Sequence, residues 1–176
     1  ADSIGATESP FEDAVKAMLE QRGWAVRPQI GVSGYRIDLG VVEVDLTTIV
    51  DGWFGDQSEM FLIGEADEIS DEARHVVQVA FDSLYLGIRA IEPGGSVDAI
   101  SRTIYDFARG EGMDVVREYQ GHGIGRRFHQ EPGIAHVPSE PPNRTPIHPG
   151  TCFTIEPMIN TGSWHTDRVE SDGWTV

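Results

Sequence analysis

The chain has 176 residues, of which 39% are apolar, and it carries a formal net charge of −16. This length fits one domain with a sizeable core, and the acidic balance disfavours nucleic acid or anionic membrane as a partner, because both require a basic face. We see no signal peptide and no apolar run near the ~20 residues that span a bilayer. A lone cysteine, Cys152, excludes an internal disulfide framework and lies in an apolar run, so we expect a buried, unreactive thiol. These features predict a soluble, cytoplasmic protein.

The first 42 residues begin with a helix signature. Ser9 is a candidate N-cap, Pro10 suits the first helical position, and Glu12 closes a capping box. Apolar residues then recur at helical spacing until Gly23, and two strand candidates follow before residue 42.

A hairpin is predicted next. Residues 41–50 form a long β-prone run, Asp51-Gly52 is a turn signal, and residues 53–63 supply a returning strand. Asp45 and Asp56 would meet at one edge of this hairpin, where two carboxylates repel each other unless a proton or a cation lies between them. Such oxygen ligands, with a nitrogen partner, suit manganese, cobalt, iron or zinc.

Two amphipathic helices are expected after the hairpin. The first is capped by Asp71 and ends near Gly87 or Ala90, and the second runs from about Val97 to Arg109. We assign their apolar faces to the core and the acidic clusters at residues 65–68 and 71–72 to solvated surface. The apolar positions are Val76, Val77, Val79, Ala80, Leu84, Leu86, Ile100, Ile104, Phe107 and Ala108.

A glycine- and histidine-rich stretch occupies residues 119–132, after a short predicted strand at residues 114–118. Alternating glycines cannot form a stable helix, since each costs about 1 kcal/mol there, but they allow close backbone approach. His122 and His129 could offer a nitrogen to a metal or a proton to a substrate. The alternative is a glycine-rich surface loop with incidental histidines.

The last predicted strand, residues 151–159, follows a proline-rich irregular segment and carries Glu156 among apolar neighbours. A glutamate is costly to bury there unless it is paired or bound to a metal. Asp45, Asp56, His122 and Glu156 are therefore four candidate metal ligands. Beyond them we expect a polar loop and the start of another strand at residues 174–176.

Residues from about 43 to 176 resemble the catalytic part of type I methionine aminopeptidases. Six segments carry the resemblance, in order: residues 44–47, 51–56, 121–125, 128–132, 153–158 and 172–176. The resemblance implies an α/β (α+β) architecture, a partial pita-bread fold with an antiparallel sheet and two covering helices. It also implies two divalent ions (Co, Mn, Fe or Zn) as cofactors and N-terminal methionine peptides of nascent, ribosome-borne chains as substrates.

The resemblance also implies a role for each candidate residue. Asp45 would hold one ion, Asp56 would bridge both, and His122 and Glu156 would bind the second. Thr47 would orient the bridging water, Glu156 would take its proton, and His129 would contact the substrate.

The chain departs from the family pattern in two places. A bridging glutamate is expected beyond Val176, and the family's substrate-facing histidine has no counterpart before Asp45. We therefore expect impaired turnover by this chain, and self-association through exposed sheet edges.

Residues 9–41 resemble instead the start of a restriction-endonuclease-like domain, with Glu12 and Asp38 matching two metal-binding carboxylates. The family's carboxylate-x-Lys strand is missing, since Glu43-Val44-Asp45 follows without a lysine. We accordingly predict a domain boundary after residue 42, separating 1–42 from 43–176. Three other interpretations stay open: a creatinase- or prolidase-type relative, a non-catalytic binding module of the same fold, and a nuclease fragment.

Overall fold

The computed structural model describes residues 40–63 and 69–167. The chain divides between Ile37 and Asp38 into two units, and all described residues belong to the second. The predicted N-terminal helix, the nuclease-like carboxylates Glu12 and Asp38, and the strand expected at residues 174–176 lie outside the described residues.

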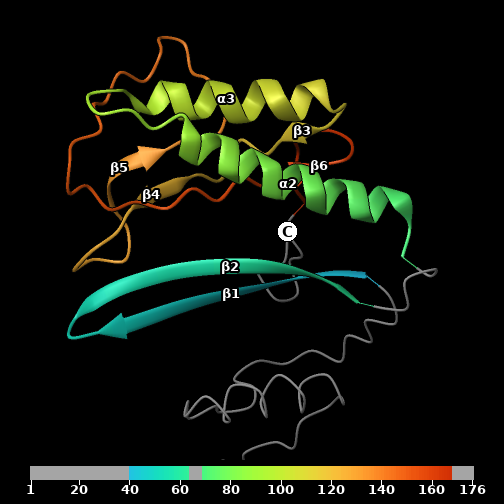
Figure 1. Cartoon of the computed structure of the whole chain (residues 1–176), viewed down its shortest axis with the longest axis horizontal. Helices are drawn as coiled ribbons and strands as arrows, with labels where there is room; N and C mark the ends of the chain where they lie inside the picture. The colour runs from blue at the N-terminus through green and yellow to red at the C-terminus, as the bar shows by residue number, and fades with distance from the viewer. Residues whose placement is uncertain (1–39, 64–68, 168–176) are drawn as a thin grey trace, which may run out of the picture. The chain divides into compact units, whose positions relative to one another are not determined.

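The predicted hairpin is confirmed. Strand β1 (Gly40–Val50) pairs antiparallel with β2 (Trp53–Ile63) in an unbroken register (Figure 1). The turn residues Asp51 and Gly52 both have positive φ, 52° and 77°, as two-residue hairpin turns that match the strand twist require. Asp-Gly tolerates this conformation, so the local sequence sets the register.

That register gathers three candidate site residues on one face of the hairpin. Thr47 lies directly opposite Asp56, and Asp45 lies directly opposite Ser58. Residues two apart on a strand share a face, and directly opposite residues share it too. Asp45, Thr47 and Asp56 are therefore neighbours across the two strands.

The two predicted helices are present as α2 (Asp71–Arg89) and α3 (Val97–Gly110). The cap of α2 is Ser70, whose side chain accepts a hydrogen bond from the Ala73 N–H at 3.1 Å, so the prediction of Asp71 as the cap was wrong by one residue. Asp71 instead lies in the first turn, where a negative charge complements the helix dipole.

The two helices approach each other closely (Figure 1). Gly87 is buried within α2, and a Cβ atom there would lie 2.8 Å from Ile104 Cδ1 on α3. The helix was expected to end near Gly87 or Ala90, and it ends at Arg89 with Ala90 as its C-cap. The core forms around this crossing, and its buried members are Val79, Val97, Ile100, Ile104, Ala108, Met113, Val115, Ile134 and Ile147.

Two further sheets, each of two strands, complete the described structure. Strand β3 (Asp114–Val115) pairs with β6 (Ile159–Asn160), and β4 (Gly121–Gly123) pairs with β5 (Gln130–Ile134), all antiparallel. The strands of the described residues thus form three separate two-stranded sheets. Among these residues no helix is long and apolar enough to cross a membrane.

The strand predicted over residues 151–159 is mostly absent, although its chain path is extended. Residues 152–154 instead hydrogen-bond to the free side of β4, through Ile124 N–H to the Cys152 carbonyl at 3.0 Å and Thr154 N–H to the His122 carbonyl at 2.8 Å. Cys152 is exposed, so the prediction of a buried thiol was wrong.

Candidate metal centre

Strand β4 lies between two backbone segments, and its glycines make this possible. A Cβ at Gly121 would overlap the carbonyl oxygen of Thr154, and a Cβ at Gly123 would overlap that of Glu131. Residues 121–125 are all buried. The alternative of a glycine-rich surface loop is therefore wrong, and the glycines serve close backbone approach on both sides of His122.

His122 is only 9% exposed, and its ring orientation is fixed by its own backbone. Nδ1 lies 3.0 Å from the Gly123 carbonyl oxygen. A carbonyl can only accept, so Nδ1 carries the proton and the neutral ring keeps its lone pair on Nε2. This tautomer is the one that a metal-ligating histidine uses.

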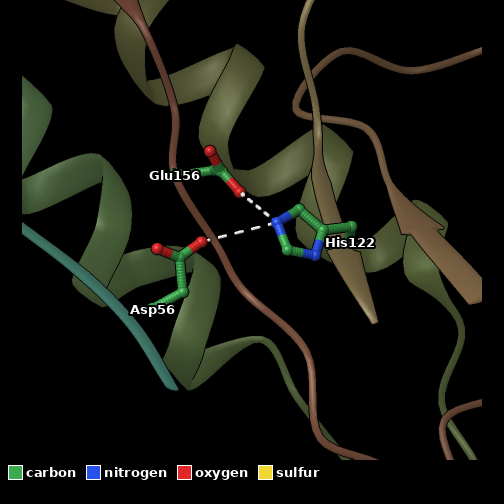
Figure 2. Close-up of side chains that lie close together, drawn as sticks. All are labelled: Asp56, His122 and Glu156. Carbon is green, nitrogen blue, oxygen red and sulfur yellow. Dashed lines mark ion pairs between the residues drawn. The ribbon is translucent and has the colours of Figure 1, made fainter. Parts of the chain in front are cut away.

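Two carboxylate oxygens lie close to this Nε2, so three electron-pair donors meet at one point (Figure 2). It lies 3.4 Å from Asp56 Oδ2 and 3.6 Å from Glu156 Oε1, and the three atoms all lie within 4.8 Å of one another. A lone pair facing two carboxylates is repulsive unless a cation or a proton lies between them. Atoms bound about 2.1 Å from one tetrahedral ion lie about 3.4 Å apart, so the spacing fits a divalent metal.

The second carboxylate oxygen of Asp56, which does not face His122, gives an independent test of whether a metal fits here. Oδ1 is buried and has no hydrogen-bond partner among the described residues. A buried polar atom without a partner is rare and costs about 1–3 kcal/mol. The mixed oxygen and nitrogen donors, together with this free oxygen, suit a divalent transition metal.

Asp45 lies beside this cluster but is not one of its three members. Burial is the largest cause that raises the pKa of Asp45, followed by the charges of Asp56 and Glu43. Burial also raises the pKa of Glu156, while a hydrogen bond from Thr154 and the neighbouring His122 lower it. Desolvation and the neighbouring carboxylates therefore leave the pKa of both groups raised, an effect that a bound cation would oppose.

His129 lies next to His122 at an open cavity of about 740 Å³. The two rings meet edge to face with centroids 4.2 Å apart, and Arg127 and Glu131 also line the cavity. His129 is exposed, so its ring is accessible to a molecule in the cavity. Thr47 remains across the hairpin from Asp56, on the same face of the sheet.

The hairpin is attached to the glycine-rich stretch by contacts of residues 125–128. The Phe54 N–H donates to the Gly125 carbonyl at 2.8 Å, and the Phe54 and Phe128 rings lie 5.8 Å apart. The Arg126 guanidinium lies 4.7 Å from the centroid of the Trp53 ring. These contacts bring Asp56 to His122 although the two residues are far apart in the sequence.

Two residues around the cluster were not singled out from the sequence. Thr154 Oγ1 accepts from the His122 N–H at 2.9 Å and donates to Glu156 Oε1 at 2.6 Å. His136 is 2% exposed, and its Nε2 accepts from the Glu156 N–H at 3.2 Å. Thr154 could have been found, because it precedes Glu156 by two residues in an extended segment and so shares its face. His136 has no comparable spacing signal.

Burial lowers the pKa of His136 to about 4, so this histidine is neutral near pH 7. A neutral ring that accepts through Nε2 carries its proton on Nδ1. The backbone of Glu156 is therefore held by a buried acceptor while its side chain is held by Thr154.

Comparison with known proteins defines the class of this protein. The profile of metallopeptidase family M24 matches residues 13–174, and the chain belongs to this family. The methionine aminopeptidase of Escherichia coli (strain K12) is 43% identical over 139 residues, which are 79% of this chain and 51% of that protein. The chain thus spans about half the length of such relatives.

Solved structures agree with this assignment. The crystal structure of methionine aminopeptidase from Rickettsia prowazekii matches with a TM-score of 0.70 and 38% identity, over 77% of this chain and 53% of that one. A prolidase from Pyrococcus furiosus matches with a TM-score of 0.55 at 20% identity, over 66% of this chain and 33% of that one, which shows the fold alone. The pita-bread fold expected from the sequence is confirmed.

The resemblance of residues 9–41 to a restriction-endonuclease-like domain finds no support. The M24 profile begins at residue 13, inside that stretch. The predicted domain boundary after residue 42 stays a prediction.

Proposed function

We propose that the protein is a metal-dependent methionyl aminopeptidase, which removes the N-terminal methionine from nascent chains. The observation that carries the proposal is the convergence of His122 Nε2, Asp56 Oδ2 and Glu156 Oε1 within 4.8 Å of one another. Relatives at 38–43% identity that are named methionine aminopeptidases support the same activity.

In this proposal Asp56, His122 and Glu156 would hold one divalent ion, and Asp45 would hold a second together with Asp56. Asp45 shares a face of the hairpin with Asp56, and its pKa is raised by partial desolvation and then by the charge of Asp56. Cobalt, manganese, iron and zinc all suit such a mixed donor set.

When bound, divalent ions activate a water molecule as a nucleophile and polarise the scissile carbonyl. Glu156 would accept the proton of that water, and partial desolvation, which raises its pKa, makes it a stronger base than a fully solvated glutamate. Thr47, opposite Asp56, would orient the water through its hydroxyl. His129 would donate a hydrogen bond to the substrate from the edge of the cavity.

The substrate would enter the cavity beside His129, whose volume of about 740 Å³ lies in the range of small-molecule sites. Nascent chains expose an N-terminal methionine in the cytoplasm, at the ribosome, so we place the activity there. Self-association of the chain likewise remains a prediction.

Methionine release from a Met-Ala-Ser peptide tests the proposal. The protein expressed from its complete coding sequence is stripped of metal and reloaded with Co²⁺ or Mn²⁺, with His122→Ala as the paired variant. We expect metal-dependent release that the variant lacks. A folded, metal-loaded protein that releases no methionine would instead favour the non-catalytic binding module.

A further inference from the structure

The Thr154 side chain contacts two candidate ligands at once. Its Oγ1 lies 2.9 Å from the His122 backbone nitrogen and 2.6 Å from Glu156 Oε1. A second backbone contact, from Thr154 N–H to the His122 carbonyl at 2.8 Å, fixes the threonine against β4. Both the backbone and the side chain of Thr154 therefore contact the site.

The direction of these hydrogen bonds follows from the groups involved. The His122 N–H can only donate, so Oγ1 accepts there. Two acceptors compete for the hydroxyl proton, the His122 carbonyl at 3.4 Å and Glu156 Oε1 at 2.6 Å, and the nearer, ionised carboxylate takes it. The 2.6 Å distance is that of a charge-assisted O–H···O⁻ bond, about twice as strong as a neutral one. The hydroxyl therefore acts as a bridge of fixed direction between His122 and Glu156.

Glu156 needs such a bridge more than the other two members of the cluster. Its side chain is 42% exposed, against 11% for both Asp56 and His122. A glutamate has three rotatable bonds, and without a partner a partly exposed one samples several rotamers. The Oε1 atom that Thr154 holds is the same atom that lies 3.6 Å from His122 Nε2.

We propose that Thr154 is a positioning residue of the metal centre, which holds the Glu156 carboxylate at the distance from His122 that a shared divalent ion requires. The inference rests on the proposed metal centre and adds a residue that neither binds the ion nor contacts substrate. Partners of this kind typically contribute about 10–100-fold to metal affinity.

The test compares Thr154→Val, which removes the hydroxyl at nearly constant volume, with Thr154→Ser, which keeps it. Co²⁺ binding is followed by visible absorption, and unfolding of the metal-free protein is followed separately. We expect the valine variant to bind Co²⁺ about 10–100-fold more weakly and with an altered spectrum, and the serine variant to recover both.

Ser101→Ala is the matched control for a merely structural loss. The Ser101 hydroxyl donates to the Ala135 carbonyl at 2.6 Å, but Ser101 contacts no candidate ligand. We expect this variant to lose stability and to keep its Co²⁺ affinity and spectrum. Wild-type Co²⁺ affinity and spectrum in Thr154→Val would overturn the inference.

Two outcomes need separate readouts. If Thr154→Val does not fold, a crystal structure of the Cd²⁺-loaded wild-type protein serves as the test instead. A Thr154 hydroxyl that lies beyond hydrogen-bond distance of Glu156, roughly 2.5–3.0 Å, would overturn the inference. If wild-type protein binds no Co²⁺, the metal centre itself fails and this inference fails with it. Failure of the inference alone leaves wild-type binding intact.

Discussion

The two halves of the candidate metal centre differ in how the surrounding chain holds them. His122 lies on the buried strand β4, which is bonded to β5 on one side and, on the other, to residues 152–154 of the segment that carries Glu156; we call this the buried half. Asp45 and Asp56 come from the β1–β2 hairpin, which is held to the buried half by the Phe54 N–H bond to Gly125 and by contacts of aromatic rings.

The backbone segments of the two halves differ in burial, although the Asp56 side chain is 11% exposed and that of Glu156 is 42% exposed. Every residue from Gly121 to Gly125 is buried, whereas Asp45, Leu46, Thr47, Thr48, Ile49 and Val50 are all exposed. Substitutions of the enclosed β4 glycines should therefore act mainly on the stability of the fold, and those of the hairpin carboxylates should act mainly on metal binding. A bound ion would also tie the hairpin to the buried half.

Asp56→Asn should give the largest effect and should separate the two halves most clearly. We expect the loss of Co²⁺ affinity to exceed the ~10–100-fold that outer-shell partners contribute, because Asp56 is a candidate ligand. The metal-free protein should be equally stable or more stable, since Asp56 raises the pKa of both Asp45 and Glu156 by repulsion. Calorimetric titration and chemical denaturation measure the two quantities.

Asp51→Asn, in the hairpin turn, is the control, since an asparagine tolerates its positive φ. It should leave both Co²⁺ affinity and stability unchanged. A clear loss of stability in Asp56→Asn would show that the hairpin carboxylate serves the fold, contrary to the comparison.

Acid should destabilise the buried half through His136. Its pKa is about 4 in the folded protein and about 6.5 when unfolded, so the unfolded chain binds more protons between these values. The free energy of unfolding is therefore highest above pH 6.5. It falls as the pH drops toward 4, by about 3 kcal/mol in total from His136. Denaturant unfolding of the metal-free protein from pH 7.5 to 4 measures it.

The matched variant is His136→Gln, which offers an acceptor that does not titrate in this range. The raised pKa values of Asp45 and Glu156 contribute with the opposite sign in both proteins and cancel in the difference. Equal pH slopes for the two proteins would contradict burial of a neutral His136.

Gly123→Ala should reduce stability by about 1–3 kcal/mol, as overpacking does, because the new Cβ overlaps the Glu131 carbonyl. Gly110→Ala is the control: Gly110 is exposed at the end of α3, with nothing within 4 Å of an added Cβ, so stability should stay equal or rise slightly. Thermal unfolding compares the two. A harmless Gly123→Ala would mean that β4 is not enclosed on both sides.

The parts of the structure that could be predicted from the sequence depend on local signals. The hairpin follows from β-prone runs around Asp51-Gly52, and the helices follow from apolar periodicity and nearby caps. Asp56, His122 and Glu156 could be chosen as candidate ligands because an acidic or imidazole group among apolar or glycine neighbours is costly to bury unless it is paired or binds a metal.

The remaining features depend on contacts distant in sequence. Glycine propensity indicates a loop at residues 121–125, yet pairing on both sides makes residues 121–123 a buried strand. The apolar run at residues 151–159 indicates a buried strand, but its bonds to β4 leave Cys152 exposed. His136 meets Glu156 only after the chain has folded, so its spacing carries no signal.

Anomalous diffraction from crystals grown with Mn²⁺ or Co²⁺ tests the central claim most directly. We expect a metal peak within about 2.0–2.3 Å of His122 Nε2, Asp56 Oδ2 and Glu156 Oε1, with a second peak beside Asp45 if the centre is dinuclear. A protein saturated with metal whose anomalous peaks all lie away from these three atoms would contradict the account.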